Sequence, residues 1–221
     1  LVDGVDLTEY DVQSLISQRL AEGGFETDHP AIVGVNAHSS DPHYAPVAGQ
    51  SCLIRQGDWV LIDLWARRPG DSNVFADITW VATASAGIRP EQQQVFDIVR
   101  RARDLIVDRL HEAWRVDEPL QGHELDRLAR DHIAGAGYGD RFLHRTGHSL
   151  SPGPAVHGLG ANLDDVESQD TRILLPGTGF TIEPGIYLDD FGVRLEINVY
   201  VDPKTGPTVT TPIQDKIVLL A

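Results

Sequence analysis

The sequence predicts an α+β fold, in which one domain mixes helices with strands. Two observations support this prediction. Three segments show helix caps or apolar residues at three- and four-residue spacing, and several shorter runs are rich in β-branched and aromatic residues. No low-complexity linker divides the 221 residues, so we expect a single domain over residues 1–221.

Three helices are expected. Thr8 is a plausible N-cap and a glycine pair follows residue 22, which together predict a helix near residues 8–22. Pro90 opens a long helix that runs to about Arg115. Its apolar stripe consists of Val95, Val99, Ala102, Ile106, Leu110 and Ala113. A shorter helix ended by glycines is expected within residues 122–139.

Strands are expected between and after these helices. The runs AIVGVN (31–36), WVLIDLWA (59–66) and SNVFADITWVATAS (72–85) are each typical of a strand. The stretch FTIEPGIYLDDFGVRLEINVYV (180–201) predicts two strands joined by a Gly/Asp turn. The chain closes on a further apolar run, DKIVLLA (215–221).

Composition excludes several classes of protein. The net charge of −15 disfavours a nucleic-acid partner, because phosphate binding needs a basic patch. No run of about 18 apolar residues is present, so no membrane span is expected. No signal peptide is visible, and we expect a cytoplasmic location. The single cysteine, Cys52, excludes an internal disulfide and is expected to be a small buried residue. Because the sequence contains no methionine, we expect a piece of a longer protein, truncated at its N-terminus.

Four carboxylates lie inside apolar runs, where a charge is costly unless something positive compensates it. They are Asp63, Asp77, Glu183 and Glu196. Any one of them could be an exposed edge residue or a salt-bridge partner. The only basic residue within these runs is Arg194, so metal ions are the more economical compensation for all four.

Three histidines lie close together in FLHRTGHSLSPGPAVHGLG (142–160), namely His144, His148 and His157. One imidazole added to four carboxylates gives an oxygen-rich ligand set. Such a set suits Mn²⁺, Co²⁺, Fe²⁺ or Zn²⁺ better than a metal that prefers thiolates. Five ligands are too many for one tetrahedral ion, but they suit two ions about 3.5–4 Å apart that share carboxylates.

The ordered segments LIDLWA, ADIT, TGHSL, FTIEPGIY and VRLEINVYV resemble the dinuclear metallopeptidases of the pita-bread (creatinase/aminopeptidase) fold. This is the family of methionine aminopeptidase, aminopeptidase P and prolidase. NAHSSDPHY (36–44) and ELDRLARDHIAGAGYGDRFLH (124–144) are similar to further family segments. The resemblance covers nearly the whole chain. It implies a curved, mostly antiparallel sheet flanked by helices with an internal pseudo-twofold, and a catalytic domain without the N-terminal domain of prolidase.

The resemblance also implies residue roles. Asp63 would bind one metal, Asp77 and Glu196 would bridge both, and His148 and Glu183 would bind the second. Glu183 would also act as the general base. His144 and His157 match positions that stabilise the tetrahedral intermediate, and His43 matches one that lines the substrate site. Arg194 matches the Xaa-Pro branch, and His157 and Arg194 are expected to contact substrate.

The implied function is hydrolysis of an N-terminal peptide bond, Xaa-Pro in particular, by a hydroxide that bridges two metal ions. Mn²⁺ is the expected metal, a short peptide the substrate and a homodimer the assembly. Two alternatives stay open: hydrolysis of another small amide, and a non-catalytic binding module on the same fold.

The chain departs from the family pattern around the expected pocket. The two aspartates lie further apart than is usual, Trp80 stands where an arginine often follows DIT, and Gly158 stands where an acid often follows the second histidine. Ile197 likewise replaces an acid. These differences leave all five ligands in place and bear on substrate preference.

Overall fold

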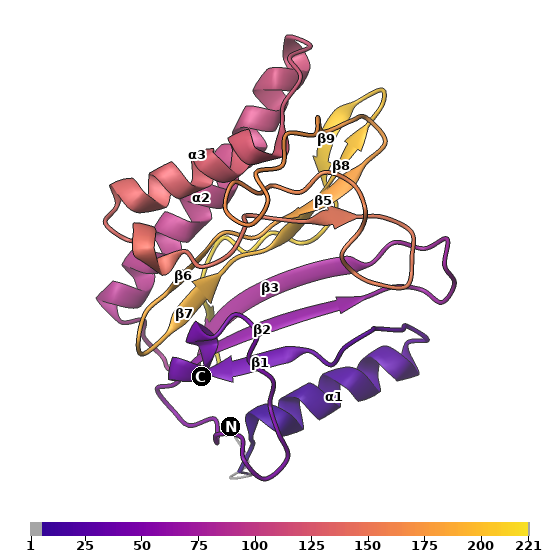
Figure 1. Cartoon of the computed structure of the whole chain (residues 1–221). Coiled ribbons are helices and arrows are strands. Elements are labelled where there is room, and N and C mark those ends of the chain that lie inside the picture. Colours follow the sequence, from indigo (N-terminus) through magenta and orange to yellow (C-terminus); the bar gives the residue numbers. More distant parts are fainter. Residues whose placement is uncertain (1–5, 221) are drawn as a thin grey trace.

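The computed structural model describes residues 6–220 of the chain (Figure 1). The helices are α1 (Glu9–Glu22), α2 (Pro90–Arg115) and α3 (Gly122–Gly135), with the 3₁₀ turns η1 (Asn36–Ser40) and η2 (Gly139–Arg141). The strands are β1 (Ile32–Val35), β2 (Trp59–Ala66), β3 (Ala76–Thr83), β4 (Ser149–Leu150), β5 (Gly179–Ile182), β6 (Gly185–Tyr187), β7 (Gly192–Arg194), β8 (Ile197–Asp202), β9 (Gly206–Val209) and β10 (Val218–Leu219).

The helices begin and end close to the predicted positions, because their signals are local. Thr8 caps α1 in both directions: its hydroxyl accepts from the Asp11 N–H, and the Asp11 carboxylate accepts from the Thr8 N–H at 2.8 Å. Pro90 occupies the first turn of α2, where a missing N–H costs nothing. The predicted helices are therefore confirmed.

The strands form two four-stranded sheets and one hairpin. One sheet has the order β1-β2-β3-β10, the other the order β4-β5-β8-β9, and β6 pairs with β7. Every pairing is antiparallel except that of β10 with β3. Helix α1 precedes the first sheet along the chain and α3 precedes the second, which fits the expected repeat of one helix-and-sheet unit.

The prediction of two strands joined by a turn over residues 180–201 is confirmed, since β5 pairs with β8 and β6 with β7 on either side of a turn at residues 188–191. Each predicted strand is, however, interrupted. The structure divides this stretch into β5, β6, β7 and β8, with breaks at Glu183–Pro184 and Leu195–Glu196. Pro184 has no N–H for a ladder. The Glu196 N–H donates to the Thr79 carbonyl of β3 at 3.2 Å instead of to a neighbour in its own sheet. Both glutamates therefore lie just outside strands and not within them.

The two sheets meet where Asn198 of β8 faces Asp77 of β3. The Asn198 Oδ1 accepts from the Asp77 N–H at 2.9 Å, and its Nδ2 donates to the Asp77 carbonyl at 2.7 Å. The carboxamide therefore satisfies both main-chain groups of Asp77, as a strand partner would. This contact fixes Asp77 relative to the second sheet.

The faces of β2 are covered by different helices, because successive side chains point to opposite sides. Trp59 and Leu61 pack in the main core with residues of α2 and α3. Val60 packs in a smaller cluster with Val12 of α1. In Figure 1, α2 and α3 lie together on one side of the sheets, while α1 lies beside β1. Further along the face of Trp59 and Leu61, Asp63 lines a cavity and not the core.

Two smaller expectations have different outcomes. Cys52 is exposed, so the expectation of a buried thiol is wrong; the residue lies in the segment between η1 and β2, and its N–H donates to the Glu9 carboxylate at 2.8 Å. Across residues 6–220, none of the helices combines the length and apolarity that a bilayer span requires.

Candidate metal centre

The two aspartates come from adjacent antiparallel strands and share one face. The register pairs Asp63 with Thr79 and Trp65 with Asp77, so the two carboxylates are diagonal neighbours. Both are buried, with exposed fractions of 7% for Asp63 and 4% for Asp77. The longer connection between β2 and β3 leaves this pairing intact.

The two glutamates approach from the second half of the chain, and threonine hydroxyls hold them. Thr181 donates to the Glu183 Oε1 at 2.9 Å. Thr79, which lies two residues after Asp77 on the same face of β3, donates to the Glu196 Oε2 at 2.8 Å. Each hydroxyl fixes one carboxylate oxygen and leaves the second oxygen for another partner.

His148 completes the group and is oriented by its neighbours. Its main-chain N–H donates to the Thr181 hydroxyl at 2.9 Å. Its ring atom Nδ1 lies 3.1 Å from the Ser149 carbonyl, which can only accept. The Nε2 atom is thereby directed inward, 3.3 Å from an Asp77 oxygen and 3.6 Å from a Glu183 oxygen. Asp77, His148 and Glu196 offer ligand atoms that all lie within 4.8 Å of one another.

The electrostatics of this group favour the binding of a proton or another cation. Burial raises the pKa of Asp77 to about 7, although a hydrogen bond from His148 opposes the shift. Burial also raises the pKa of Glu183, and burial together with the Asp77 charge raises that of Glu196 well above its usual range. Burial alone would lower the pKa of His148, but Asp77 and Glu183 outweigh it and raise the pKa.

The residues present fit divalent metal ions. Asp63 Oδ1 and Glu196 Oε1 are buried carboxylate oxygens with no hydrogen-bond partner among residues 6–220. An unpartnered buried carboxylate oxygen is costly unless it is paired or coordinates a metal. The donor set, carboxylate oxygens with one imidazole nitrogen, is one that Mn²⁺ and related ions accept.

A cavity of about 600 Å³ opens above these side chains, within the usual range for small-molecule sites. All five predicted ligands line it, together with His43, His144, His157 and Arg194. The structure therefore brings every sequence-predicted site residue to one cavity. His43 and His157 are exposed there, and the ring of His157 lies 4.2 Å from that of His148, centroid to centroid. Although the residue is exposed, partial desolvation of its ring by the cavity wall, with smaller effects of His148 and Arg145, lowers the pKa of His157 to about 4.

Arg194 is fully engaged within the cavity wall. Its guanidinium donates to Asp63 Oδ2 at 2.6 Å, to the Tyr187 hydroxyl at 2.8 Å and to the Thr79 hydroxyl at 3.1 Å. It thus ties Asp63 of the first sheet to the β6–β7 hairpin. The ion pair with Asp63 offsets part of the negative charge of the site.

Both ring nitrogens of His144 also have partners. Its Nδ1 lies 2.7 Å from the Arg145 carbonyl and its Nε2 lies 2.6 Å from the Tyr187 hydroxyl. Because the Arg145 carbonyl can only accept, the neutral ring carries its proton on Nδ1, and Nε2 accepts from the Tyr187 hydroxyl. Burial, then the Arg194 charge, lowers the pKa of His144 to about 3. A neutral His144 would reach a substrate oxygen only by exchanging the Tyr187 contact.

Sequence reasoning missed the residues that hold the ligands in place: Thr79, Thr181, Tyr187 and Asn198. For Thr79 a signal existed, because it lies two residues from Asp77 and must share its face. For Thr181 the same spacing to Glu183 applies. Asn198 likewise lies two residues from Glu196, but its partner Asp77 lies 121 residues away, so the sequence does not reveal that contact.

A second group that includes a cysteine and a histidine is an anchor for the loop that carries His43. Glu9 is fully buried, and its carboxylate accepts from the Val35 N–H, the Cys52 N–H, the Tyr44 hydroxyl and the His38 ring at 2.7–2.9 Å. Glu9, His38 and Cys52 are close enough to hold an ion. However, four donors already surround this carboxylate, so its role is to hold the loop.

Comparisons with known proteins identify the family of the chain. The model of the metallopeptidase family M24 matches residues 2–203. The uncharacterized peptidase YqhT of Bacillus subtilis is 33% identical over 201 residues, which cover 90% of this chain and 51% of that protein. The Xaa-Pro dipeptidase of Lactobacillus helveticus is 29% identical over 192 residues, 85% of this chain and 45% of that protein.

A solved structure of a prolidase from Thermococcus sibiricus superposes with a TM-score of 0.80 at 28% identity, covering 96% of this chain and 53% of that one. The chain thus spans about half the length of the curated relatives it matches.

Proposed function

Since this chain belongs to metallopeptidase family M24 and has the pita-bread fold of its structural relatives, we propose that it hydrolyses an N-terminal peptide bond, Xaa-Pro in particular, with two divalent metal ions. The observation that carries the proposal is the convergence of five side chains from both sheets. Two of them, Asp63 and Glu196, present a buried oxygen without a partner in the described part of the chain.

Each ligand has a proposed place. Asp63 would hold one ion, His148 and Glu183 the other, and Asp77 and Glu196 both. The oxygen-rich donor set supports Mn²⁺ as the first choice, with Co²⁺, Zn²⁺ and Fe²⁺ as alternatives. Divalent ions in such a site supply Lewis-acid polarisation of the scissile carbonyl and a nucleophile from water at neutral pH.

Glu183 is the proposed general base. Its Oε1 accepts from Thr181 and Glu183 lines the cavity, which supports a role in which the other oxygen takes a proton from water and delivers it to the leaving nitrogen. His157, which is exposed, is proposed to donate a hydrogen bond to the oxygen that gains charge. His144 is proposed to do the same once its proton lies on Nε2 and its contact with Tyr187 is exchanged.

The preference for Xaa-Pro rests on likeness to relatives that carry that name and on Arg194. Arg194 is proposed to contribute to substrate binding as well as to hold Asp63, and His43 to line the same cavity. Proline has no N–H, so a site for it needs room for the ring and no acceptor for an amide hydrogen. Assembly as a homodimer, a cytoplasmic location and a single catalytic domain over residues 1–221 remain predictions.

The decisive experiment compares Ala-Pro, Ala-Pro-Ala and Met-Ala as substrates with added Mn²⁺. We expect cleavage of the Xaa-Pro compounds, loss of activity with EDTA and recovery on adding Mn²⁺ back. Cleavage of Met-Ala alone would replace the Xaa-Pro assignment with another small amide. Metal binding without cleavage of any compound would favour the non-catalytic alternative.

Replacing the base gives a second prediction. Glu183→Gln should lower kcat by about 10²- to 10⁴-fold, because the acceptor for the proton is lost. Turnover and metal content are measured together, with Glu112→Gln on the exposed face of α2 as the matched control. Near-normal turnover in Glu183→Gln would contradict the assignment of the base.

A further inference from the structure

Arg145 is a positive group in the cavity that the chemistry above leaves unused. It lines the cavity next to His144, with its side chain 21% exposed. The other arginine in the lining, Arg194, directs its guanidinium to Asp63, Tyr187 and Thr79. Arg145 makes one side-chain hydrogen bond among the described residues, from Nη1 to Glu167 at 3.2 Å. A guanidinium has five N–H donors, so most of those of Arg145 are free to bind a ligand.

The segment that carries Arg145 and the turn that carries Glu167 are each fixed by a buried carboxylate. Asp126 of α3 accepts from the Thr146 N–H at 2.8 Å and the Thr146 hydroxyl at 2.6 Å. Arg130, which also pairs with Asp126, donates to the His144 carbonyl at 2.8 Å. Arg145 therefore lies between two residues that are held to the same helix.

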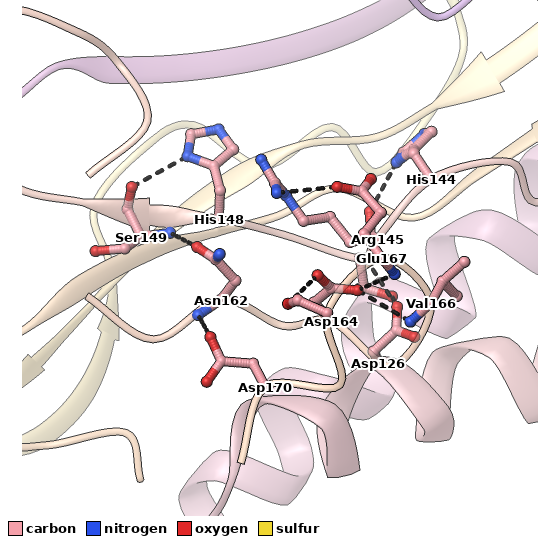
Figure 2. Close-up of polar contacts among 12 residues, drawn as sticks. Asp126, His144, Arg145, His148, Ser149, Asn162, Asp164, Val166, Glu167 and Asp170 are labelled. Carbon is pink, nitrogen blue, oxygen red and sulfur yellow. Dashed lines mark hydrogen bonds and ion pairs between the residues drawn. The ribbon is translucent and has the colours of Figure 1, made fainter. Parts of the chain in front are cut away.

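The turn that carries Glu167 is fixed in the same way. Asp164 accepts from the Val166 N–H at 3.0 Å, the Glu167 N–H at 2.8 Å and the Ser168 hydroxyl at 2.6 Å. Figure 2 shows this frame, with the Arg145 guanidinium reaching Glu167 and lying, in this view, between the rings of His148 and His144. Such a preorganised donor group loses little entropy when it binds a ligand.

The charges of the cavity complement a small zwitterion. Carboxylates dominate the group around His148, while Arg145 supplies positive charge on the wall beside it. We propose that Arg145 binds the free C-terminal carboxylate of the substrate, and that the chain is therefore a dipeptidase and not an aminopeptidase of longer peptides. This inference rests on the proposed function, because it assumes that the cavity binds a peptide for cleavage.

The preferred length of the substrate follows from the distance between its scissile bond and its C-terminal carboxylate. In a dipeptide the carboxylate belongs to the residue directly after the scissile bond, whereas each further residue moves it by about 3.5 Å. Arginine binds carboxylates with paired donors in a fixed geometry, so a displaced carboxylate or a neutral amide loses much of the interaction. Glu167 orients Arg145 and competes with the substrate for it.

The test compares Ala-Pro, Ala-Pro-amide and Ala-Pro-Ala with Mn²⁺ present. The wild-type protein should prefer Ala-Pro over the other two in kcat/KM. Arg145→Gln should lower kcat/KM for Ala-Pro by roughly 10- to 100-fold, through KM and not kcat, as expected for a lost charge-assisted hydrogen bond. The loss on Ala-Pro-amide should be much smaller, because the amide has no carboxylate for Arg145 to bind. Arg145→Lys should recover part of the preference for the free acid.

Controls separate this inference from a purely structural role. Arg127→Gln removes an arginine that pairs with Asp165 at 2.8 Å but does not line the cavity, so its kinetics should equal those of the wild type. Glu167→Gln frees Arg145 from its competitor and should keep or increase the preference for the acid. It also decides the question if Arg145→Gln fails to fold, since loss of the preference in Glu167→Gln would mean that the ion pair only supports the loop.

Two outcomes separate the inference from the function on which it rests. Equal wild-type kcat/KM values for Ala-Pro and its amide would overturn the role of Arg145 and leave the peptidase assignment standing. An unchanged acid preference in Arg145→Gln would do the same. No cleavage of any of the three compounds would overturn both.

Discussion

Gly147 shows how closely a single residue can be constrained at this site. It precedes His148, and a Cβ added to it would lie 2.1 Å from the Thr181 carbonyl of β5. The chain passes so close to β5 because the His148 N–H donates to the Thr181 hydroxyl while the Thr181 N–H donates to the His148 carbonyl. The position of the His148 imidazole therefore requires a glycine, which has no side chain, at position 147.

We predict that Gly147→Ala lowers the free energy of unfolding by about 1–3 kcal/mol, since the backbone of β5 must move to accept the methyl group. Uptake of Mn²⁺ should weaken in parallel, because His148 shifts with the backbone. Chemical denaturation and calorimetry with Mn²⁺ measure the two effects. Gly135→Ala is the matched control, because a Cβ there meets nothing within 4 Å; equal behaviour of the two variants would refute the argument.

At the scale of elements, the sequence predicted what depends on neighbours in the chain and missed what depends on distant partners. The ends of α1 and α2 follow from Thr8 and Pro90, which act within one turn. The break before β8 depends on a hydrogen bond from Glu196 to Thr79, which are 117 residues apart. No pattern within residues 180–201 reveals that bond, so the sequence predicts the two paired strands but not their interruption.

The five proposed ligands were predictable for a different reason. A carboxylate within an apolar run is a conflict that is visible in sequence, and a family resemblance links such conflicts to one site. The hydroxyls and the amide that position the ligands create no conflict. Arg145 and Glu167 were missed because charged residues in a loop are ordinary, and only the structure puts them in the cavity wall.

Helix α1 supports the cavity through Glu9, which anchors the loop that carries His43. We predict that Glu9→Gln lowers the free energy of unfolding by about 1–3 kcal/mol, because the amide nitrogen faces donors where an oxygen accepted. KM should rise more than kcat falls, since the loop lines the cavity and holds none of the five proposed ligands. Glu22→Gln at the exposed end of α1 should stay within about 0.5 kcal/mol of the wild type. A change in kcat alone would contradict an anchoring role.

For the whole molecule, the proposed centre links stability to metal. Ligands from both sheets converge there, so an ion would bind the folded chain and not the unfolded one. At 100 times the Kd, Mn²⁺ should stabilise the fold by about 2.7 kcal/mol, seen as a rise in Tm. Glu196→Gln should remove most of that rise. It should also leave the metal-free protein as stable as the wild type or more so, because glutamine keeps an acceptor for Thr79 and removes a carboxyl group that burial makes costly to ionise.

Asp108→Asn provides the control for this experiment, since Asp108 is an exposed acid paired with Arg101 on α2. Its Tm should rise with Mn²⁺ as much as that of the wild type. A rise in Tm that survives in Glu196→Gln would show that the ion stabilises the chain elsewhere, for instance by screening its net charge of −15.

The burial of the proposed ligands has a consequence for which bonds the proposed peptidase would cleave. Asp63, Asp77 and Glu196 are only 2–7% exposed, and they line one cavity with the exposed His43 and His157. A cavity of about 600 Å³ has room for a short segment and not for a folded domain. We therefore expect cleavage of free peptides and unstructured chain ends, while compact proteins in the same solution stay intact.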